Sequence, residues 1–305
     1  MITVIVTTKN REESLRRCIK SLQKNDLKGV EIIVVYSGRF NNTEKIVHAY
    51  KCDKKSLVFA RDLGWRKAKG EIVVYIDDDV EVTKDWLKAI KDSFKDISVA
   101  GSSGPTIVSK EEMKNRDVFR MNKGIVGWFY KKIILEGREK EVGKLCSSGM
   151  WTPGSNYENS KDTYVIAREQ QRPWQSRAGL LRSARNNKVP ISVDYLEACN
   201  MALRRSLIEK VGGFDLGFKG TSEWCEVDLA MRIKKLGYRL VFNPKAKVYH
   251  HVSCDGVFKA RDNYKERMDN FLRYYFKHFK INWRFLMCVV FLNGYWVYKK
   301  IWKNI

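Results

Sequence analysis

The sequence lacks long apolar runs in its C-terminal part and lacks paired cysteines, and both absences narrow the class of protein. An apolar run there, Phe285–Leu292, has only eight residues, well short of the ~20 that a helix needs to cross a bilayer. The seven cysteines are scattered, with no CxxC pair and no Cys/His cluster at zinc spacing. We therefore expect reduced thiols in a cytoplasmic protein. The N-terminal run Met1–Val6 is too short for the apolar core of a signal peptide and is predicted to form a strand.

Acidic residues are few relative to basic ones: 35 aspartates and glutamates stand against 58 lysines and arginines, a net charge of +23. Such a balance favours a polyanionic partner, which could be a phosphorylated metabolite, an anionic membrane surface or a nucleic acid. The sequence has no helix-turn-helix, RNP-like aromatic motif or zinc module, so charge alone supports nucleic-acid binding. We do not expect nucleic acid as a partner. The 305 residues suit one large domain, or one domain with an appendage.

Apolar β-branched runs alternate with helical patterns through the first hundred residues. The predicted strands cover residues 2–7, 31–35, 56–59, 72–76 and 97–100. Two predicted helices cover residues 41–50 and 60–69. A third carries Leu15, Cys18, Ile19 and Leu22 at helical spacing. A fourth, with Thr83 as its predicted cap, carries Trp86, Leu87, Ile90 and Phe94. This alternation is typical of βαβ units in a doubly wound α/β sheet.

Three adjacent carboxylates, Asp77, Asp78 and Asp79, directly follow the apolar strand Ile72–Ile76. Ligands bind beyond the carboxyl ends of strands in open α/β sheets. Adjacent carboxylates repel one another unless a positive charge lies among them, and oxygen ligands suit Mg²⁺ or Mn²⁺. Taken alone, the triplet fits a metal site and a solvated acidic turn about equally well.

The pattern changes after residue 100. Residues 101–193 are rich in Gly, Ser, Asn and Lys, and we expect short elements and loops there. Regular structure returns at Asp194–Arg205, followed by a helix over residues 206–211, a helix that begins near Glu226, and strands over 239–242 and 247–250.

The order of these segments resembles the inverting, family-2 nucleotide-sugar glycosyltransferases of the GT-A fold. The matching segments are Val4–Arg11, Glu31–Gly38, Ala60–Gly64, the strand into Asp77–Asp79, Ala198–Arg205, Val211–Asp215, Cys225–Leu229 with Arg232, and Pro244–His250. The resemblance implies a Rossmann-like mixed sheet flanked by helices. It implies a domain over residues 1–254, with a nucleotide-binding half (1–101) and an acceptor-binding half (102–254). A helical, basic and aromatic extension would follow over residues 255–305.

The resemblance also implies where a nucleotide-diphosphate sugar, with UDP as the expected nucleotide, and Mg²⁺ or Mn²⁺ would bind. The metal ligands would be Asp79, Asp77 and His250, with Asp79 as the direct ligand. The donor would contact Thr8, Asn10 and Arg61, and its ribose would contact Asp77 or Asp78. Tyr36 stands where the family usually has an aspartate, and its ring could stack on the base. The run Gln170–Trp174 differs in order and spacing from the QxxRW motif of processive members, so we expect a non-processive enzyme.

Two acids compete for the role of general base, Glu226 and Asp228, with Glu223 in reserve. Helical spacing places Glu226 on the face of a predicted apolar stripe formed by Leu229, Ile233 and Leu236. Asp228 falls near Arg232, which makes an ion pair its simplest role. Spacing and the family position both favour Glu226, whose alternative role is to stabilise a helix N-terminus. Trp224 could be a platform for a sugar or part of the core.

The sequence therefore predicts a metal-dependent inverting glycosyltransferase that acts on a hydroxyl of a lipid-linked or envelope glycan. The alternative is a non-catalytic protein that binds nucleotide sugars or glycans on the same scaffold. Residues 255–305 contain 11 basic residues, four acids and 14 of the 37 aromatic residues. This composition fits a helix lying on the cytoplasmic face of an anionic membrane, or a docked helix with a solvated basic face.

Overall fold

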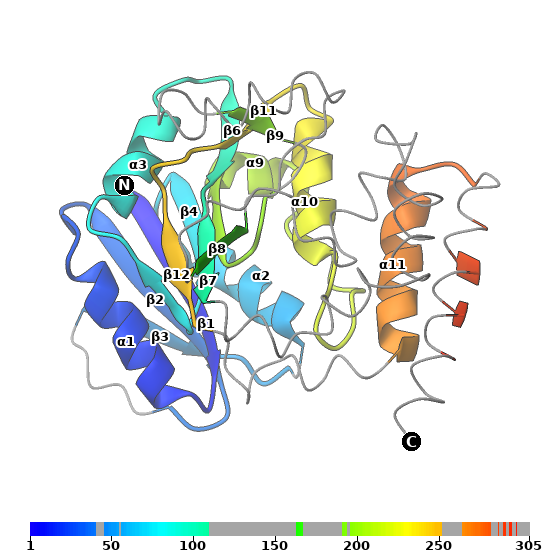
Figure 1. Ribbon diagram of the computed structural model, residues 1–305, viewed down its shortest axis with the longest axis horizontal. Helices are drawn as coiled ribbons and strands as arrows, with labels where there is room; N and C mark the ends of the chain where they lie inside the picture. Colours follow the sequence, from blue (N-terminus) through cyan, green and yellow to red (C-terminus); the bar gives the residue numbers. More distant parts are fainter. Residues whose placement is uncertain are drawn as a thin grey trace.

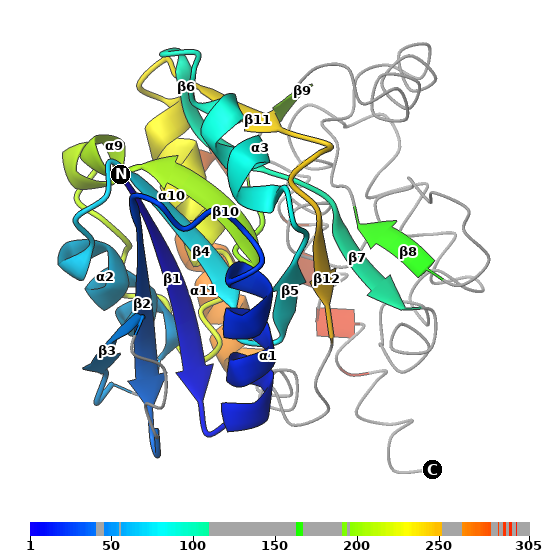
Figure 2. The same cartoon turned by 90° about the vertical axis from the view of Figure 1, so that its left-hand side faces the viewer.

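The computed structural model describes residues 1–40, 46–54, 56–109, 163–166, 191–193, 196–251 and 264–281, with residues 286, 289, 290, 293, 294 and 297. Its centre is a mixed eight-stranded sheet in the order β3-β2-β1-β4-β10-β6-β11-β9 (Figures 1 and 2). These strands are β1 (Ile2–Lys9), β2 (Val30–Ser37), β3 (Val47–Lys51), β4 (Ile72–Asp77), β6 (Val99–Ser103), β9 (Ile191–Val193), β10 (Asn200–Arg204) and β11 (Arg239–Phe242). The predicted α/β fold with a mixed sheet is confirmed.

Helices cover both faces of this sheet because its strands are apolar on both sides. The helices in the described part of the chain are α1 (Glu12–Leu22), α2 (Leu57–Lys67), α3 (Trp86–Ser93), α9 (Arg205–Lys210), α10 (Cys225–Lys234) and α11 (Tyr264–His278). Along β1, Val4 and Val6 face a core shared with α1 and α3, while Ile5 faces the core beneath α2, α9 and α10. Successive side chains of a strand point to opposite faces, so this continuous apolar run specifies a strand buried on both sides.

The first part of the large sheet is built from parallel strands. β1 pairs in parallel with both β2 and β4, and β3 extends the sheet beyond β2. The carboxyl ends of these strands lie at one edge of the sheet, so the loops after β1, β2 and β4 meet there. β10 then pairs antiparallel with β4. That pairing brings the second half of the chain against the strand that ends in the acidic triplet.

A second sheet positions the far end of the chain beside that triplet. It has the order β5-β12-β7-β8, from β5 (Val80–Val82), β12 (Val248–His250), β7 (Thr106–Ser109) and β8 (Thr163–Ile166). β12 is antiparallel to β5, with His250 opposite Val80. Asn200, in β10, links the segment before β12 to α3. Its side-chain amide donates to the carbonyl of Ala246 at 2.8 Å, and its oxygen accepts from Trp86 Nε1 at 2.9 Å.

Three local predictions were wrong. The segment 46–50, predicted to be helical, lies largely in strand β3, and the proposed cap at residues 41–43 lies outside the described residues. Residues 56–59, predicted as a strand, form the start of α2. Thr83 does not cap α3, because its hydroxyl donates to the carbonyl of Lys247. Short apolar runs fit either element, and pairing with distant segments decides between them.

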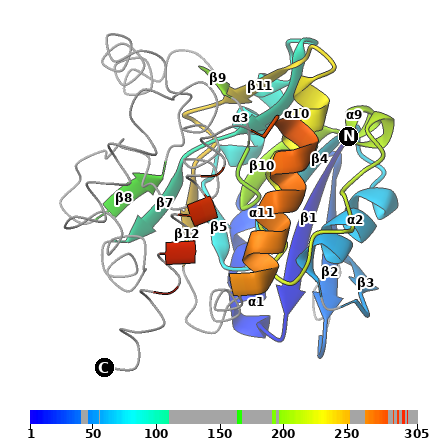
Figure 3. The same cartoon turned by 90° about the vertical axis from the view of Figure 1, so that its right-hand side faces the viewer.

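The C-terminal extension begins, where it is described, with α11, which packs beside α10 (Figures 1 and 3). Its apolar face carries Phe271, Tyr274 and Tyr275, all at least 97% buried. Among the helices that the structure describes, none is both long and apolar enough to span a membrane.

Candidate active site

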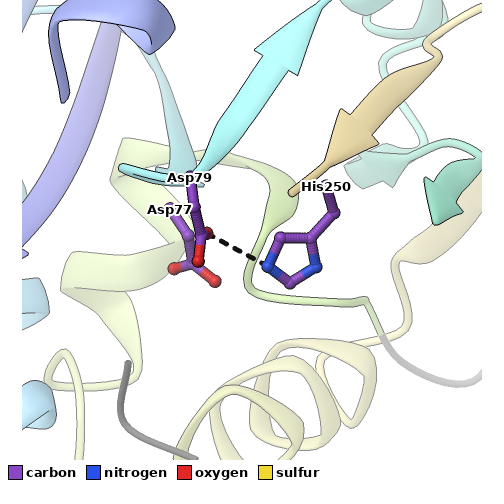
Figure 4. Close-up of side chains that lie close together, drawn as sticks. All are labelled: Asp77, Asp79 and His250. Carbon is purple, nitrogen blue, oxygen red and sulfur yellow. Dashed lines mark ion pairs between the residues drawn. The ribbon is translucent and has the colours of Figure 1, made fainter. Parts of the chain in front are cut away.

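The acidic triplet lies at the carboxyl end of β4, where the two sheets meet. Asp77 is the last residue of β4, Asp79 precedes β5, and His250 ends β12. One ligand atom from each of these three residues lies within 4.8 Å of the others. Figure 4 shows the imidazole of His250 pointing at the two carboxylates, with its Nε2 atom 3.0 Å from Asp79 Oδ1. The three residues implied as metal ligands are thus brought together.

The middle carboxylate of the triplet, Asp78, contacts Thr8 and Arg11 and is not part of the group formed by Asp77, Asp79 and His250. Asp78 accepts a hydrogen bond from Thr8 Oγ1 at 2.6 Å and another from Arg11 Nε at 3.0 Å, and it also pairs with the Arg11 Nη2 atom. Arg11 Nη2 lies 2.9 Å from Asp79 Oδ2 as well. A positive side chain from the loop after β1 therefore holds Asp78 and one oxygen of Asp79.

Burial and these partners give the three carboxyls different proton affinities. Burial raises the pKa of Asp78 to about 6, against the opposing effects of Arg11 and Thr8. Burial also raises the pKa of Asp77, against the opposing effect of Arg61. For Asp79, burial acts in the same direction, but His250 and Arg11 outweigh it, and its pKa is lowered. Asp79 is the member of the triplet that is held most firmly in the ionised state.

The side chains at this position fit a divalent cation. Asp79 Oδ1 is buried and lies 3.0 Å from His250 Nε2. Buried carboxylates cost free energy unless positive charge balances them, and a cation held by Asp77 and Asp79 would supply that charge. Two carboxylates and an imidazole offer oxygen and nitrogen donors, a combination that suits a divalent first-row transition metal such as Mn²⁺.

Arg61 links this cluster to the candidate base. It is a buried residue of α2, and its Nη2 atom lies 3.7 Å from Asp77 Oδ1 while its Nη1 atom lies 3.6 Å from Glu226 Oε2. The same Nη1 atom donates to the Cys225 sulfur at 3.5 Å. Arg61 was expected to line the nucleotide, and the structure places it between Asp77 and Glu226.

The two candidate bases lie in opposite settings on α10. Glu226 is partly exposed and faces Arg61, whereas the side chain of Asp228 is fully buried. Of the predicted apolar stripe, Leu229 and Ile233 are buried as expected, but the inclusion of Leu236 was wrong, because Leu236 is 39% exposed. The reason is that α10 ends at Lys234, so Leu236 no longer follows the helical spacing. Asp228, in contrast, is covered by α11, which the spacing of residues within α10 does not reveal.

The predicted nucleotide-contacting residues surround the ends of β1 and β2. Thr8 contacts Asp78, as described above. Asn10 has a left-handed backbone (φ 54°), and its side-chain oxygen accepts from the backbone N–H of Arg39 at 2.8 Å. Tyr36 lies near the end of β2 and stacks on Phe40, with ring centroids 4.6 Å apart. Its ring is therefore already partnered by another aromatic side chain.

Three residues that contact the acidic groups of the candidate site or of α10 received no role from the sequence. Arg11 was part of a segment that matches the family but was given no role. The need for a positive charge beside three carboxylates could have indicated that Arg11 lies next to them. Cys225 contacts both Arg61 and Glu226. His278 contacts Asp228 across 50 residues of chain, and no sequence spacing indicates that pairing.

Trp224 belongs to the core. It is 3% exposed and stacks on Tyr274, with ring centroids 5.0 Å apart and planes 19° apart. It precedes α10 with φ 78°, a left-handed conformation that is rare for bulky residues and costs about 1–3 kcal/mol. Contacts with α11 therefore hold an unfavourable backbone at the start of the helix that carries Glu226.

Known proteins resemble this chain in fold and sequence. A pre-mycofactocin glycosyltransferase of Mycobacterium tuberculosis is 25% identical over 259 residues, which cover 82% of this chain and 42% of that protein. The glucosyl-dolichyl phosphate glucuronosyltransferase of Haloferax volcanii is 21% identical over 176 residues, 54% of each chain. This chain thus spans less than half the length of the first relative.

Among solved structures, the mannosyltransferase PcManGT of Pyrobaculum calidifontis, in complex with GDP-Man and Mn²⁺, has a TM-score of 0.54 at 16% identity. The match covers 97% of this chain and 68% of that one, and it shows the GT-A fold. Residues 3–212 match the family described as Glycosyl transferase family 2. Because this match covers more than half of the sequence, the chain belongs to glycosyl transferase family 2.

Proposed function

We propose that this protein is a metal-dependent, inverting and non-processive glycosyltransferase that uses a nucleotide-diphosphate sugar. One observation carries the proposal: Asp77, Asp79 and His250 converge at the carboxyl end of β4, and Arg61 connects that cluster to the partly exposed Glu226. A diphosphate site and a general base are the two groups that such a transfer requires.

Asp79, Asp77 and His250 would hold the cation. When bound, a divalent ion would stabilise the negative charge of the departing diphosphate as a Lewis acid. The imidazole ligand favours Mn²⁺ over Mg²⁺, which prefers oxygen ligands alone. Arg11 lies beside two of the carboxylates and neutralises part of their charge, so it would also face the phosphates of the donor.

Glu226 would accept the proton of the acceptor hydroxyl as that oxygen attacks the sugar. Its partial exposure leaves it accessible to an acceptor, and Arg61 fixes it relative to Asp77. Because the acceptor attacks directly and no side chain forms a glycosyl bond, the configuration at the sugar carbon inverts. The fully buried Asp228 accepts contacts from three basic side chains, which favours a structural role for it.

The test is a donor screen on purified protein, with UDP-, GDP- and dTDP-sugars and with Mn²⁺ or Mg²⁺. We expect turnover with one nucleotide class, UDP first, and loss of turnover when EDTA removes the metal. Excess Mn²⁺ should restore it. Binding of a donor without turnover under every condition would instead support a non-catalytic binding protein. Equal turnover with and without EDTA would contradict metal dependence.

We further propose a lipid-linked or envelope glycan acceptor and contact with a membrane surface. The name of the Haloferax volcanii relative includes a dolichyl phosphate, which is a lipid carrier. The described part of the extension also exposes large apolar side chains, namely Phe276, Ile281, Leu286, Val290 and Val297. Apolar side chains next to basic residues suit the interface of an anionic bilayer.

Vesicle flotation tests this surface. The wild-type chain should float with vesicles that contain anionic phospholipid and should float less with neutral vesicles. Replacing Phe276, Leu286 and Val290 together by glutamate should weaken binding more than about tenfold, since each loses apolar burial. The control is Ile97→Glu, because Ile97 is an exposed apolar residue outside the extension. Equal flotation of the triple variant and the wild type would contradict membrane contact through these residues.

A further inference from the structure

Helix α11 contacts the helix of the candidate base through a buried ionic cluster. The carboxylate of Asp228, on α10, lies 2.9 Å from His278 Nε2 and 3.2 Å from Lys277 Nζ, both on α11. Arg232 Nε, on α10 itself, lies 2.9 Å from the other carboxylate oxygen. The side chains of Asp228 and His278 are at most 1% exposed. Buried ionic contacts hold their partners in one geometry, because a shift leaves a charge unpaired.

The loop before α10 is attached to the same helix. Asp215 accepts two hydrogen bonds from Arg273, both at 2.7 Å. The side chain of Asn270 accepts from the backbone N–H of Lys219 at 2.7 Å and donates to its carbonyl at 2.9 Å. α11 therefore holds both the loop that leads into α10 and the first turn of α10.

The junction between that loop and α10 needs such support. Ser222 and Trp224 both have positive φ, 55° and 78°. Stacking of Trp224 on Tyr274, and its contact with Phe271, keep the indole in place. Glu226 lies two residues beyond Trp224, so a relaxation of this backbone would move its carboxylate relative to Arg61.

We propose that α11 is a brace that sets the position of Glu226, and that His278 is its principal positioning residue, acting through Asp228. The role of Glu226 rests on the proposed function, whereas the effect of α11 on the first turn of α10 does not. His278 touches neither the metal cluster nor Glu226 in the contacts described, and its influence on transfer passes through α10.

The test compares His278→Leu with His278→Gln in the full chain. Leucine removes the donor to Asp228, and glutamine retains an N–H at a similar reach. We expect His278→Leu to lower kcat for transfer on the order of tenfold to a hundredfold, the effect of a small misplacement of a catalytic group. The KM for the donor should stay unchanged, and His278→Gln should restore most of kcat. The control is Asp269→Asn, which breaks the more exposed ion pair of α11 with Lys219 and should leave kcat unchanged.

Amide hydrogen exchange measures the local stability of the first turn of α10 and does not depend on enzyme activity. Exchange over residues 225–229 should accelerate in His278→Leu and remain at the wild-type rate in His278→Gln and Asp269→Asn. If the wild type transfers no sugar but exchange responds as expected, the proposed function fails and the brace stands. If transfer occurs and His278→Leu changes neither kcat nor exchange, the brace is refuted. Equal losses in His278→Leu and His278→Gln would also refute it.

Discussion

Replacing Glu226 by glutamine should abolish sugar transfer, with kcat reduced about 10²- to 10⁴-fold, the contribution of a positioned general base. Glutamine keeps the shape of the side chain and an oxygen that faces Arg61, but it does not accept a proton from a hydroxyl at neutral pH. The proposed donor site, around Asp77 and Asp79, lies on the other side of Arg61. Donor affinity, measured by isothermal titration calorimetry, should therefore stay within about twofold of the wild type.

Two matched substitutions separate the base from its neighbours. Glu223→Gln changes an acid three residues earlier in the chain and should retain most of the transfer activity. Asp228→Asn removes a buried charge that balances Arg232 and Lys277 and that contacts His278. It should lower the free energy of unfolding by about 3–5 kcal/mol, as loss of one partner of a buried ion pair does. Retained transfer in Glu226→Gln, together with loss in Glu223→Gln, would assign the base to Glu223.

Replacing Asp79 by asparagine should remove metal-dependent activity. The buried Asp79 Oδ1 lies 3.0 Å from His250 Nε2, and Asp79 belongs to the three-residue cluster with Asp77 and His250. Asparagine retains the volume and removes the charge. We expect the affinity for Mn²⁺ to fall by at least about a hundredfold, because loss of a residue that only orients a ligand already costs 10- to 100-fold. Transfer at a fixed Mn²⁺ concentration should fall with it.

Mn²⁺ binding is measured by titration calorimetry in the presence of a nucleoside diphosphate, so that the result does not depend on transfer. The control is Asp53→Asn, because Asp53 is a highly exposed acid that pairs with Lys51 on the surface. Asp78→Asn is the informative comparison, since Asp78 is held by Thr8 and Arg11 and lies outside the three-residue cluster. It should weaken Mn²⁺ binding less than Asp79→Asn does. Equal Mn²⁺ affinity in wild type and Asp79→Asn would rule out the proposed metal site.

The pattern of residues within one segment predicted the structure correctly where that pattern alone distinguishes a strand from a helix. The apolar run Ile72–Ile76 specified a strand buried on both faces, and the structure places the triplet at its carboxyl end. The spacing of Leu15, Cys18, Ile19 and Leu22 specified a helix, and all four side chains are buried. The order of the motifs also sufficed to identify the family, which the match over residues 3–212 shows.

Local pattern was insufficient where a distant segment decided the outcome. Residues 47–51 form a strand because β2 offers an open edge, and the pairing of Val47 with Ile32 is not encoded in that segment alone. Asp228 is buried because α11 covers α10, although the two contacting side chains are 50 residues apart. Pairing of sheet edges and docking of helices depend on surfaces that form only when separate segments meet.

The sequence by itself determined the class of fold, the family and the acidic triplet, because strand burial, helix spacing and motif order are properties of short stretches. Only the tertiary structure decided which carboxylates share a site. The pairing of β12 with β5 placed His250 beside Asp79. Arg61 contacts both Glu226 and Asp77 of this cluster, and Asp228 instead contacts His278 of α11. Each of these contacts joins residues far apart in the chain, so its geometry depends on the packing of the whole domain.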